Sequence, residues 1–428
     1  MKKVVLGVLA LGLLAVPIVA WAQIASLVPN VAVVAQQLAW LFGVLGFVIL
    51  FFQFVLSSRV RFLEADVGLD RMIHLHRLTG VVGLSLVVLH FAAVAVFELI
   101  EFGYLNLTLL KFSGTLGLLV ILLVAFAALF YKRIGWRYET WKRIHLAGYL
   151  VFPIVFIHSY YLSNRIVTSR PYVDVYWWVL LGIYVAIVLY KIGLAISVIR
   201  RPYTVSSAVA ANHDVTTVTF EGPGLKHKPG QFMLVSVQVG GRLEPSHPYT
   251  IASSPEAPNL QISAKAIGDF SSALRTVKRG SRAYIEGPYG VFSFLEHDAP
   301  SLVFVAGGIG ITPFMSQLRH IRDAGMDRKV RLIWGNKTEA DICFGDELEA
   351  MKSRLTDFDL VHVMSNQDDW PGEKGFITRE IIERYVDDID TATFFVCGPP
   401  IMMDKVIPML GALGVPSPRV RYERFSLG

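Results

Sequence analysis

The sequence predicts a multi-domain membrane protein, in which an all-α transmembrane helix bundle is followed by an antiparallel β-barrel and then by an α/β domain. Of the 428 residues 54% are hydrophobic, and nearly all the long apolar runs lie before Arg200. After Pro202 short alternating runs are separated by glycine and proline, as in antiparallel strands. After Pro300 strands alternate with helices. We therefore expect three domains, at residues 1–201, 202–298 and 299–428.

Six apolar runs are candidates for membrane helices, since each approaches the length of about 20 residues that a helix needs to cross the hydrocarbon core. The first has a basic start and an Ala20-Trp21-Ala22 ending, as a cleaved secretory signal would, although we favour a first span. The expected spans are residues 1–22, Val31 to Leu56, His74 to Glu98, Gly114 to Tyr131, His145 to Leu162, and Val173 to Ile199.

Basic residues in the loops give the expected orientation. They gather between the second and third spans, between the fourth and fifth, and after the sixth, whereas the other loops are less basic. Because basic loops stay on the cytoplasmic side, the amino terminus and the whole soluble half should be cytoplasmic. These loops explain the net charge of +6 better than nucleic-acid binding does.

Two of the spans each contain a pair of histidines. Ionisable side chains inside a span are costly and indicate pairing, an ion path or a bound metal. His76 and His90 are 14 positions apart, which corresponds to roughly 21 Å along a helix and to nearly the same face. His145 and His158 are 13 positions apart. Two helices with imidazoles at two depths could hold two iron porphyrins, one near each membrane surface.

The second histidine pair does not fit an ideal helix. A spacing of 13 places His145 and His158 roughly 140° apart around the axis. Pro153 lies between them, and we expect a kink there to bring both onto one face. A single intramembrane histidine is usually a hydrogen-bonding residue of the bundle, but four at matched depths favour haem ligation. His74 points to a different face from His76 and is an inferior alternative ligand.

The chain has two cysteines, Cys343 and Cys397, both in the soluble half. They are far apart and form no CxxC or CxxCH motif. This pattern argues against a disulfide framework, a structural zinc site and covalently attached c-type haem. Any haem in this protein should therefore be b-type.

Two segments of the barrel region could bind a planar cofactor that carries a phosphate. Residues 246–251 (SHPYTI) give a strand with an aromatic and a hydroxyl side chain. Residues 268–274 (GDFSSAL) give a glycine turn into a helix started by Ser271, whose backbone N–H groups could face a phosphate. A strand and a capped helix without any ligand is the competing interpretation.

The α/β region has two glycine turns at the ends of strands. In residues 301–318 a buried strand leads into a turn from Gly307 to Gly310 and then into a helix with Thr312 as its cap and Pro313 in its first turn. The turn lacks the last glycine of the usual dinucleotide fingerprint. A later strand runs into residues 397–400 (CGPP) at the carboxyl edge of the sheet, where ligands bind.

Together the soluble motifs resemble the ferredoxin–NADP reductase family, in which a flavin barrel precedes a nicotinamide domain. HPYTIASSP is similar to the flavin-binding strand, GDFSSAL to the flavin phosphate loop, GPYG to the turn facing the dinucleotide, GGIGITP to the pyrophosphate turn, and CGPP to the segment beside the nicotinamide. His247 stands where many members have arginine, which is typical of the membrane-bound NADPH oxidase and ferric reductase branch. The histidine pairs resemble the transmembrane domain of that branch.

The resemblance implies FAD, two b-type haems and NADPH or NADH as cofactors. His76 would pair with His145, and His90 with His158, as iron ligands. Cys397 would lie near the transferred hydride, and a C-terminal aromatic, Phe425 rather than Tyr422, would cover the flavin. The remaining residues implied are His247, Pro248, Tyr249, Thr250, Gly268, Ser271 and Ser272 for FAD, and Gly307, Gly308, Gly310, Ile311, Thr312, Pro313, Gly398 and Pro399 for the nucleotide.

The resemblance also implies a multi-pass oxidoreductase of a bacterial-type inner membrane, passing electrons from cytoplasmic NAD(P)H through FAD and haem to an extracytoplasmic acceptor. We expect O2, giving superoxide. A ferric chelate and a periplasmic redox protein are the alternatives, because Val94 stands where superoxide-forming members often have a second histidine. A non-catalytic haem-binding sensor is disfavoured, since the flavin and nicotinamide motifs are intact.

Nucleotide preference depends on the segment after the second α/β strand. Lys337 could meet the 2′-phosphate of NADPH, whereas Glu339 could favour the bare ribose of NADH. We favour NADPH.

Overall fold

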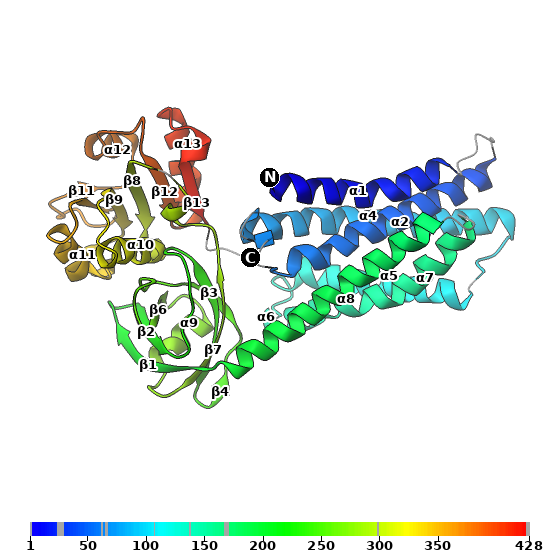
Figure 1. Cartoon of the computed structure of the whole chain (residues 1–428), viewed down its shortest axis with the longest axis horizontal. Helices are drawn as coiled ribbons and strands as arrows, with labels where there is room; N and C mark the ends of the chain where they lie inside the picture. Colours follow the sequence, from blue (N-terminus) through cyan, green and yellow to red (C-terminus); the bar gives the residue numbers. More distant parts are fainter. Residues whose placement is uncertain are drawn as a thin grey trace. The chain divides into compact units, whose positions relative to one another are not determined.

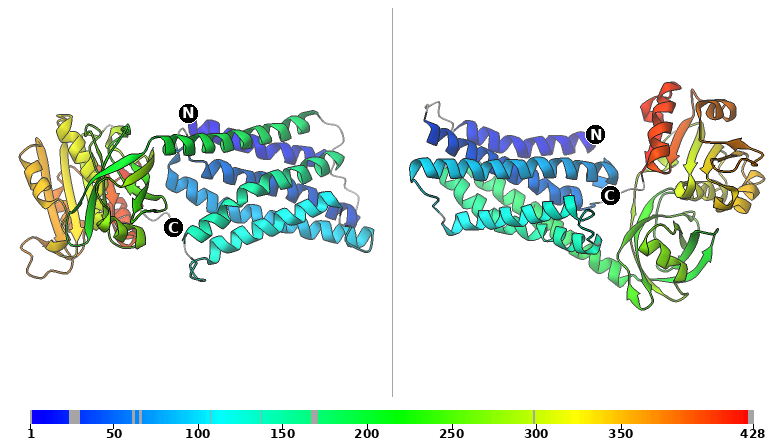
Figure 2. Two further views of the ribbon diagram at one scale, coloured as in Figure 1. Left: turned by 90° about the horizontal axis from the view of Figure 1, so that it is seen from below. Right: turned by 180° about the vertical axis from the view of Figure 1, so that it is seen from behind.

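The computed structural model describes residues 2–23, 30–60, 63–64, 67–106, 108–136, 138–166, 171–297 and 299–424. These residues form two compact units, Met1–Gly193 and Leu194–Gly428, which are described separately. Figure 1 and Figure 2 show the helical first unit and the mixed second unit.

The first unit is a bundle of long helices that run side by side (Figure 1, Figure 2). Among the described residues, five segments are long and apolar enough to cross a membrane. They correspond to α2 (Val31–Ser57), α4 (Leu69–Glu101), α5 (Leu109–Phe130), α6 (Tyr138–Leu146) with α7 (Gly148–Ile166), and α8 (Pro171–Arg200). The helix α1 (Lys2–Ala22) packs beside α2 and contains a shorter apolar segment, Leu11–Ala22.

The span that contains His145 and His158 is interrupted at Ala147, between α6 and α7. There the N–H of Ala147 bonds to the carbonyl of Ile144, and the N–H of Leu150 bonds to the carbonyl of Ala147. Both bonds join residues three positions apart, as in a 3-10 helix, which is wound more tightly than an α-helix. The span between the two histidines therefore contains an interruption at Ala147 in addition to Pro153, and the kink expected at Pro153 stays a prediction.

Pro153 lies inside α7, and its effect is seen in the neighbouring helix. Proline has no N–H, so the carbonyl of Tyr149, four residues earlier, loses its helical hydrogen bond. The hydroxyl of Tyr184 in α8 donates to this carbonyl at 2.6 Å. The proline thus creates an acceptor that attaches α8 to α7, because a backbone carbonyl in a membrane must be satisfied within the protein.

Glycines allow the helices that carry the histidines to approach their neighbours closely. A Cβ atom at Gly46 of α2 would lie 2.8 Å from the side chain of Val87 in α4, and one at Gly83 of α4 would lie 2.9 Å from Leu50. Small residues at such crossings are the usual means of close packing between membrane helices. Aromatic residues of α2, α7 and α8 fill the buried centre, including Phe47, Phe51, Phe152, Phe156 and Trp177.

The second unit begins with an antiparallel sheet of seven strands, as expected. Its order is β4-β3-β7-β1-β2-β6, with β5 paired to β3. The short helix α9 (Asp269–Ala273) follows β6. The strands are β1 (Tyr203–Ala210), β2 (Val215–Glu221), β3 (Phe232–Val239), β4 (Arg242–Leu243), β5 (His247–Thr250), β6 (Leu260–Lys265) and β7 (Arg282–Tyr289).

A parallel sheet of six strands follows, in the order β11-β10-β9-β8-β12-β13. The strand order reverses between β8 and β12, so these two neighbours flank the switch point at which open α/β sheets bind ligands. The strands are β8 (Ser301–Gly307), β9 (Lys329–Asn336), β10 (Asp357–Met364), β11 (Glu373–Lys374), β12 (Thr393–Cys397) and β13 (Val420–Glu423).

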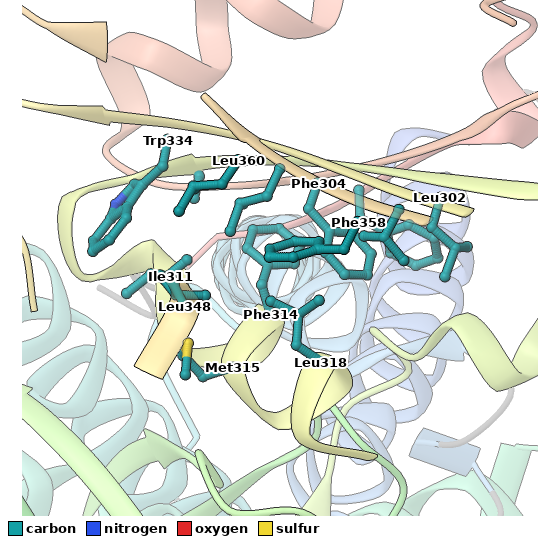
Figure 3. Close-up of a cluster of buried hydrophobic side chains, with 14 of the residues drawn as sticks. Leu302, Phe304, Ile311, Phe314, Met315, Leu318, Trp334, Leu348, Phe358 and Leu360 are labelled. Carbon is teal, nitrogen blue, oxygen red and sulfur yellow. The ribbon is translucent and has the colours of Figure 1, made fainter. Parts of the chain in front are cut away.

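Helices cover both faces of the parallel sheet. One buried cluster joins the sheet to α10 (Thr312–Asp323) and α11 (Gly345–Lys352), and another joins it to α12 (Arg379–Tyr385) and α13 (Pro400–Ala412). Figure 3 shows the first cluster, in which Phe304 stacks on Phe314 with ring centroids 4.7 Å apart. This packing fixes α10, and therefore the turn that precedes it, against the end of β8.

Candidate functional site

The outer histidine pair consists of His90 of α4 and His158 of α7, whose ring centroids are 6.1 Å apart with planes at 84°. Each ring is held by a backbone carbonyl of another helix. The Nδ1–H of His90 donates to Ala39 and that of His158 donates to Leu110, both at 2.7 Å. Since a carbonyl can only accept, these bonds place the proton on Nδ1 and leave Nε2 of a neutral ring able to bind a metal.

Two glycines make room for the outer rings. A Cβ atom at Gly43 of α2 would lie 2.7 Å from Nδ1 of His90. One at Gly114 of α5 would lie 2.5 Å from Cε1 of His158. Only glycine allows the two helix backbones to approach the rings this closely, so the positions of His90 and His158 are built into the neighbouring helices.

The inner histidine pair consists of His76 of α4 and His145 of α6, with ring centroids 5.8 Å apart and planes at 60°. Within the described part of the chain, Nδ1 of each ring is buried and has no hydrogen-bond partner. Aromatic rings pack beside this pair: the ring centroid of Trp141 lies 5.3 Å from that of His145, and Tyr131 stacks on Trp141 at 5.2 Å.

Both histidine pairs fit a metal ion held between two imidazoles. Bonds between a metal and an imidazole nitrogen are about 2.0–2.1 Å long, so one ion between two rings separates their centroids by roughly 6 Å. The measured separations are 5.8 Å and 6.1 Å. The structure therefore brings together the two pairs that the sequence selected, while haem ligation by them stays a prediction. His74 is exposed.

A buried ion pair lies near the outer histidines. Glu98, near the end of α4, is only 3% exposed and forms an ion pair with Lys111 in the first turn of α5. Its second carboxylate oxygen accepts a hydrogen bond of 2.9 Å from the backbone N–H of Asn106. Lys111 directly follows Leu110, whose carbonyl holds His158. No local sequence pattern indicates that these two charges meet.

In the barrel, the two segments selected for flavin binding lie against each other. The ring of His247 in β5 stacks on Phe270 of α9, with centroids 4.4 Å apart, and Tyr249 lies 5.8 Å from the same ring. Burial raises the pKa of Tyr249, so its hydroxyl stays protonated. Pro248 is exposed, whereas Thr250 is buried and its Oγ1 has no partner among the described residues. Phe270 joins these segments and was not selected from the sequence.

Ser271 has a different structural role from the one expected. The helix begins at Asp269, with Gly268 as its cap, so Ser271 does not start it. The Oγ of Ser271 accepts the N–H groups of Ile267 and Gly268, each at 3.0 Å, and donates to the carbonyl of Gly268. The hydroxyl thus closes the turn that precedes the helix. Ser272 is exposed.

The two glycine turns of the α/β domain pack backbone against backbone at the switch point. A Cβ atom at Gly310 would clash with the carbonyl of Cys397, and one at Gly398 would lie 3.0 Å from the nitrogen of Gly307. Gly308 has φ +50°, a conformation that suits glycine. Its carbonyl accepts a hydrogen bond of 3.0 Å from Nε1 of Trp334 in β9. No side chain other than hydrogen fits between these turns.

The start of α10 corrects one sequence expectation. Thr312 lies in the first turn of the helix, and its hydroxyl donates to the carbonyl of Ile309 at 3.1 Å. It does not accept a backbone N–H, as a cap residue would. Pro313 is in the first turn, as expected. Ile311, Thr312 and Pro313 are buried, which leaves mainly backbone atoms at the surface of this turn.

Cys397 ends β12 and is fully buried. The parallel pairing of β12 with β13 places Glu423 opposite it, and Oε1 of Glu423 lies 3.2 Å from where a Cβ atom of Gly290 would be. Burial, aided by the charge of Glu423, raises the pKa of Cys397, so the thiol is protonated and is no nucleophile. Glu423 was missed because it meets Cys397 only through strand register.

Two further residues that the sequence predicts to bind the nucleotide lie at the surface, and the aromatic expected to cover the flavin lies outside the described residues. Pro399 is exposed before α13, and Lys337 is exposed directly after β9. Phe425 lies outside the described residues, and Tyr422, the other C-terminal aromatic, is 44% exposed.

Helix α10 also bonds to the segment that follows the flavin strand. The hydroxyl of Ser316 donates to the carbonyl of Ser253 at 2.8 Å, and Nη1 of Arg319 donates to the carbonyl of Ala252 at 2.7 Å. Glu347 orients the same guanidinium through two hydrogen bonds of 2.8 Å and 2.6 Å. The helix that follows the GGIG turn therefore also positions the end of β5, which links the two candidate cofactor sites within the second unit.

Comparison with known families agrees with this arrangement. Residues 42–156 match the family described as ferric reductase like transmembrane component. Residues 201–293 match an FAD-binding domain, and residues 304–407 match an oxidoreductase NAD-binding domain. The chain thus combines a segment similar to a ferric reductase-like transmembrane component with segments similar to an FAD-binding domain and an oxidoreductase NAD-binding domain.

Individual relatives match about half of the chain. The reductase component of propane 2-monooxygenase from Rhodococcus jostii is 30% identical over 213 residues, which cover 48% of this chain and 57% of the relative. The glycine betaine monooxygenase reductase subunit of Chromohalobacter salexigens is 31% identical over 207 residues, covering 46% and 56%. The chain therefore spans little more than half the length of these relatives.

A solved structure with a similar fold is the flavohemoglobin from Malassezia yamatoensis with bound FAD and heme. It is 16% identical, with a TM-score of 0.51, and the match covers 92% of this chain and 96% of that one. At this identity the likeness is one of fold.

Proposed function

We propose that this protein carries electrons from cytoplasmic NAD(P)H, through FAD and two b-type haems, to an acceptor on the far side of a bacterial-type inner membrane. The observation that supports this most strongly is the pair of facing imidazoles at each of two depths in one bundle, joined in the same chain to flavin and nicotinamide modules. The loop charges support the cytoplasmic placement of the reductase modules.

The histidines would hold the haems as axial ligands, His76 with His145 and His90 with His158. When bound, FAD accepts a hydride from NAD(P)H and releases its electrons one at a time to haem iron. The hydrogen bonds from Nδ1 of His90 and His158 orient the rings and make Nε2 more basic. With two histidines for each iron, this ligand set would leave no position for the acceptor to bind, so the acceptor would react without coordinating the iron.

Backbone groups of the second unit would carry most of the nucleotide binding. The turns from Gly307 to Gly310 and at Gly398 lie at the switch point, where Gly310 and Gly398 let the two turns pack against each other and Gly308, whose Cβ position is open, would let a pyrophosphate approach the main chain. Cys397 and Glu423 lie at the same edge of the sheet, where the buried, neutral thiol would support the nicotinamide site without reacting with the ring. His247, Tyr249 and the turn closed by Ser271 would hold FAD.

Lys337 supports NADPH as the preferred donor, since its exposed ammonium could bind a 2′-phosphate. Replacing it with alanine should raise the Michaelis constant for NADPH about tenfold and leave that for NADH unchanged, because only NADPH carries the extra phosphate. Steady-state kinetics with both donors tests this. Equal effects on the two donors would contradict the assignment.

We propose O2 as the acceptor, with superoxide as the product. A ferric chelate is the second candidate, because Val94, one turn beyond His90, offers no protonatable side chain beside the outer pair and because the transmembrane match is to ferric reductases. A periplasmic redox protein is the third.

One experiment separates these acceptors. The full chain would be purified in detergent with haem and FAD, reduced anaerobically with NADPH, and followed by visible spectroscopy before air is admitted. Reduced b-type bands that disappear in air, with cytochrome c reduction blocked by superoxide dismutase, would support the oxidase. Bands that persist in air until ferric chelate is added would support the reductase. No haem reduction at all would refute the proposed electron path.

A further inference from the structure

A polar cluster joins the barrel to the nucleotide domain, next to the segment that carries Lys337. The barrel contributes the turn between β1 and β2 and the end of β6. The nucleotide domain contributes the short 3-10 helix η4 (Glu339–Asp341), which begins two residues after Lys337. The members of this cluster are Asn212, His213, Asp214, Lys265 and Asp341.

Several contacts cross from the barrel to η4. Nδ2 of Asn212 donates to the carbonyl of Asp341 at 3.0 Å, and Nδ1–H of His213 donates to the carbonyl of Ala340 at 3.0 Å. Nζ of Lys265 lies 3.5 Å from Oδ1 of Asp341 and 3.1 Å from Oδ2 of Asp214. Both the main chain and the side chain of Asp341 are therefore held by the barrel.

Asp341 also shapes the turn that follows Lys337. Its Oδ2 accepts the backbone N–H and the hydroxyl of Thr338, each at 3.0 Å, while the side chain is only 12% exposed. Burial alone would raise the pKa of Asp341, but the hydrogen bonds from Thr338 and the charge of Lys265 lower it, so the group is ionised near neutral pH. The carboxylate of Asp341 thus bonds both to the barrel, through Lys265, and to the segment Lys337–Glu339, through Thr338.

The opposite side of the segment is held by the loop after β10. The N–H of Asn366 donates to the carbonyl of Lys337 at 2.8 Å, and Oε1 of Gln367 accepts the N–H of Glu339 at 2.7 Å. The main chain of Lys337 is therefore fixed from two directions, although its side chain is exposed. A long cation attached to a fixed backbone has fewer positions to search before it meets its ligand.

The same cluster resembles a metal site, since ligand atoms of His213, Asp214 and Asp341 lie within 4.8 Å of one another. Lys265 already supplies the positive charge between the two carboxylates. Burial alone would lower the pKa of Lys265, but its bonds to Asp214 and Asp341 raise it, so the ammonium keeps its charge. The geometry favours an ion-pair network over a metal site.

We propose that Asp341 is a positioning residue for nucleotide selectivity. With Asn212 and Lys265 it fixes the Lys337–Glu339 segment against the barrel, so that the ammonium of Lys337 is held where the 2′-phosphate of NADPH binds. The inference rests on the proposed function, because it assumes that Lys337 binds this phosphate.

The test uses the full chain loaded with FAD and two fragments of the nucleotide, adenosine 2′,5′-bisphosphate and adenosine 5′-monophosphate, in calorimetric titrations. For Asp341→Asn we expect binding of the bisphosphate to weaken about threefold to tenfold, the scale of one lost charged hydrogen bond, and binding of the monophosphate to change less than twofold. The KM for NADPH should rise by a similar factor, while kcat with a soluble acceptor stays unchanged.

Two variants serve as comparisons. Asn212→Asp keeps the oxygen that accepts the N–H groups of Asp214 and Val215 but removes the donor to Asp341, so it should reproduce the loss. Asp387→Asn removes an exposed lysine partner at the other end of β9, where Asp387 lies 2.5 Å from Lys329, and should change neither titration. Flavin content and the melting temperature of each variant report whether it is folded.

The outcomes separate the inference from the proposed function. A folded Asp341→Asn variant that binds both fragments as the wild type does would refute the inference alone. Equal weakening of both fragments would also refute it, since an effect through Lys337 requires the 2′-phosphate. A wild-type protein that binds neither fragment, or does not prefer the bisphosphate, would refute the proposed nucleotide assignment, and the inference with it.

Discussion

The outer and inner histidine pairs have nearly the same ring separation but are held in different ways. His90 and His158 each donate a hydrogen bond to a backbone carbonyl. The Nδ1 atoms of His76 and His145, by contrast, make no such bond among the described residues, although the main chain of Gln53 lies near the ring of His76. The outer rings are therefore oriented by the protein itself, whereas the inner rings depend more on what binds between them. Pre-organised ligands bind more tightly because less freedom is lost on binding.

The difference follows from the helices that surround each pair. Gly43 and Gly114 bring α2 and α5 against the outer rings, so backbone carbonyls lie within reach. The inner pair includes His145, which lies on the nine-residue helix α6 before the break at Ala147. The neighbour of His145 is the aromatic side chain of Trp141, which packs against the imidazole but accepts no strong hydrogen bond.

The largest expected effect is loss of one haem on removal of an axial ligand. His90→Ala should lower the haem content from two to one per chain, because one imidazole cannot replace a facing pair. Pyridine haemochrome analysis of the purified protein measures this. His74→Ala, at an exposed position, is the control and should keep both haems. Full haem content in His90→Ala would show that the pairing is wrong.

Filling the space beside an outer ring should have the next largest effect. In Gly114→Ala the new methyl group would overlap His158, at a cost of about 1–3 kcal/mol that weakens haem binding about tenfold or more at the outer site. Gly182→Ala is the matched control, since nothing lies within 4 Å of that Cβ position. If the two variants bind haem equally, the outer pair is not confined by α5.

The two sites should also differ in affinity. A His76→Ala variant retains only the outer pair, and a His90→Ala variant retains only the inner pair. Two additional hydrogen bonds of about 1 kcal/mol each predict that the outer site binds haem roughly tenfold more tightly, or better. Titration of haem into the two apoproteins, followed at the Soret band, tests this. Equal affinities would remove the distinction between the pairs.

The smallest effect is expected for the ion pair beside the outer histidines. Glu98→Gln removes the charge that holds Lys111, which follows Leu110, whose carbonyl accepts the hydrogen bond from His158, and should weaken outer-site haem binding about threefold. Glu101→Gln, an exposed acidic position on the same helix, should have no effect. An equal change at the inner site would show that Glu98 acts on general stability and not on His158.

Features that depend on local pattern were predictable. The 14-residue spacing placed His76 and His90 on one face of α4, because that helix is continuous over both. The order of membrane helices, antiparallel strands and a parallel sheet followed from apolar length and strand period. The turns at Gly307 and Gly398 were recognisable because their chemistry is contained in a few consecutive residues.

The sequence by itself therefore determined the order of the modules, the histidines that form the two facing pairs and the positions of the glycine turns at the ends of strands. Tertiary structure decided which backbone carbonyls hold His90 and His158, where the helix breaks between His145 and His158, and that Glu423 meets Cys397. It also decided that Asp341 bonds to the barrel. The physical reason is that every residue has a backbone carbonyl, so the sequence does not mark the one that accepts a hydrogen bond. Strand register likewise pairs residues that are distant in the sequence, so such a pair leaves no local pattern.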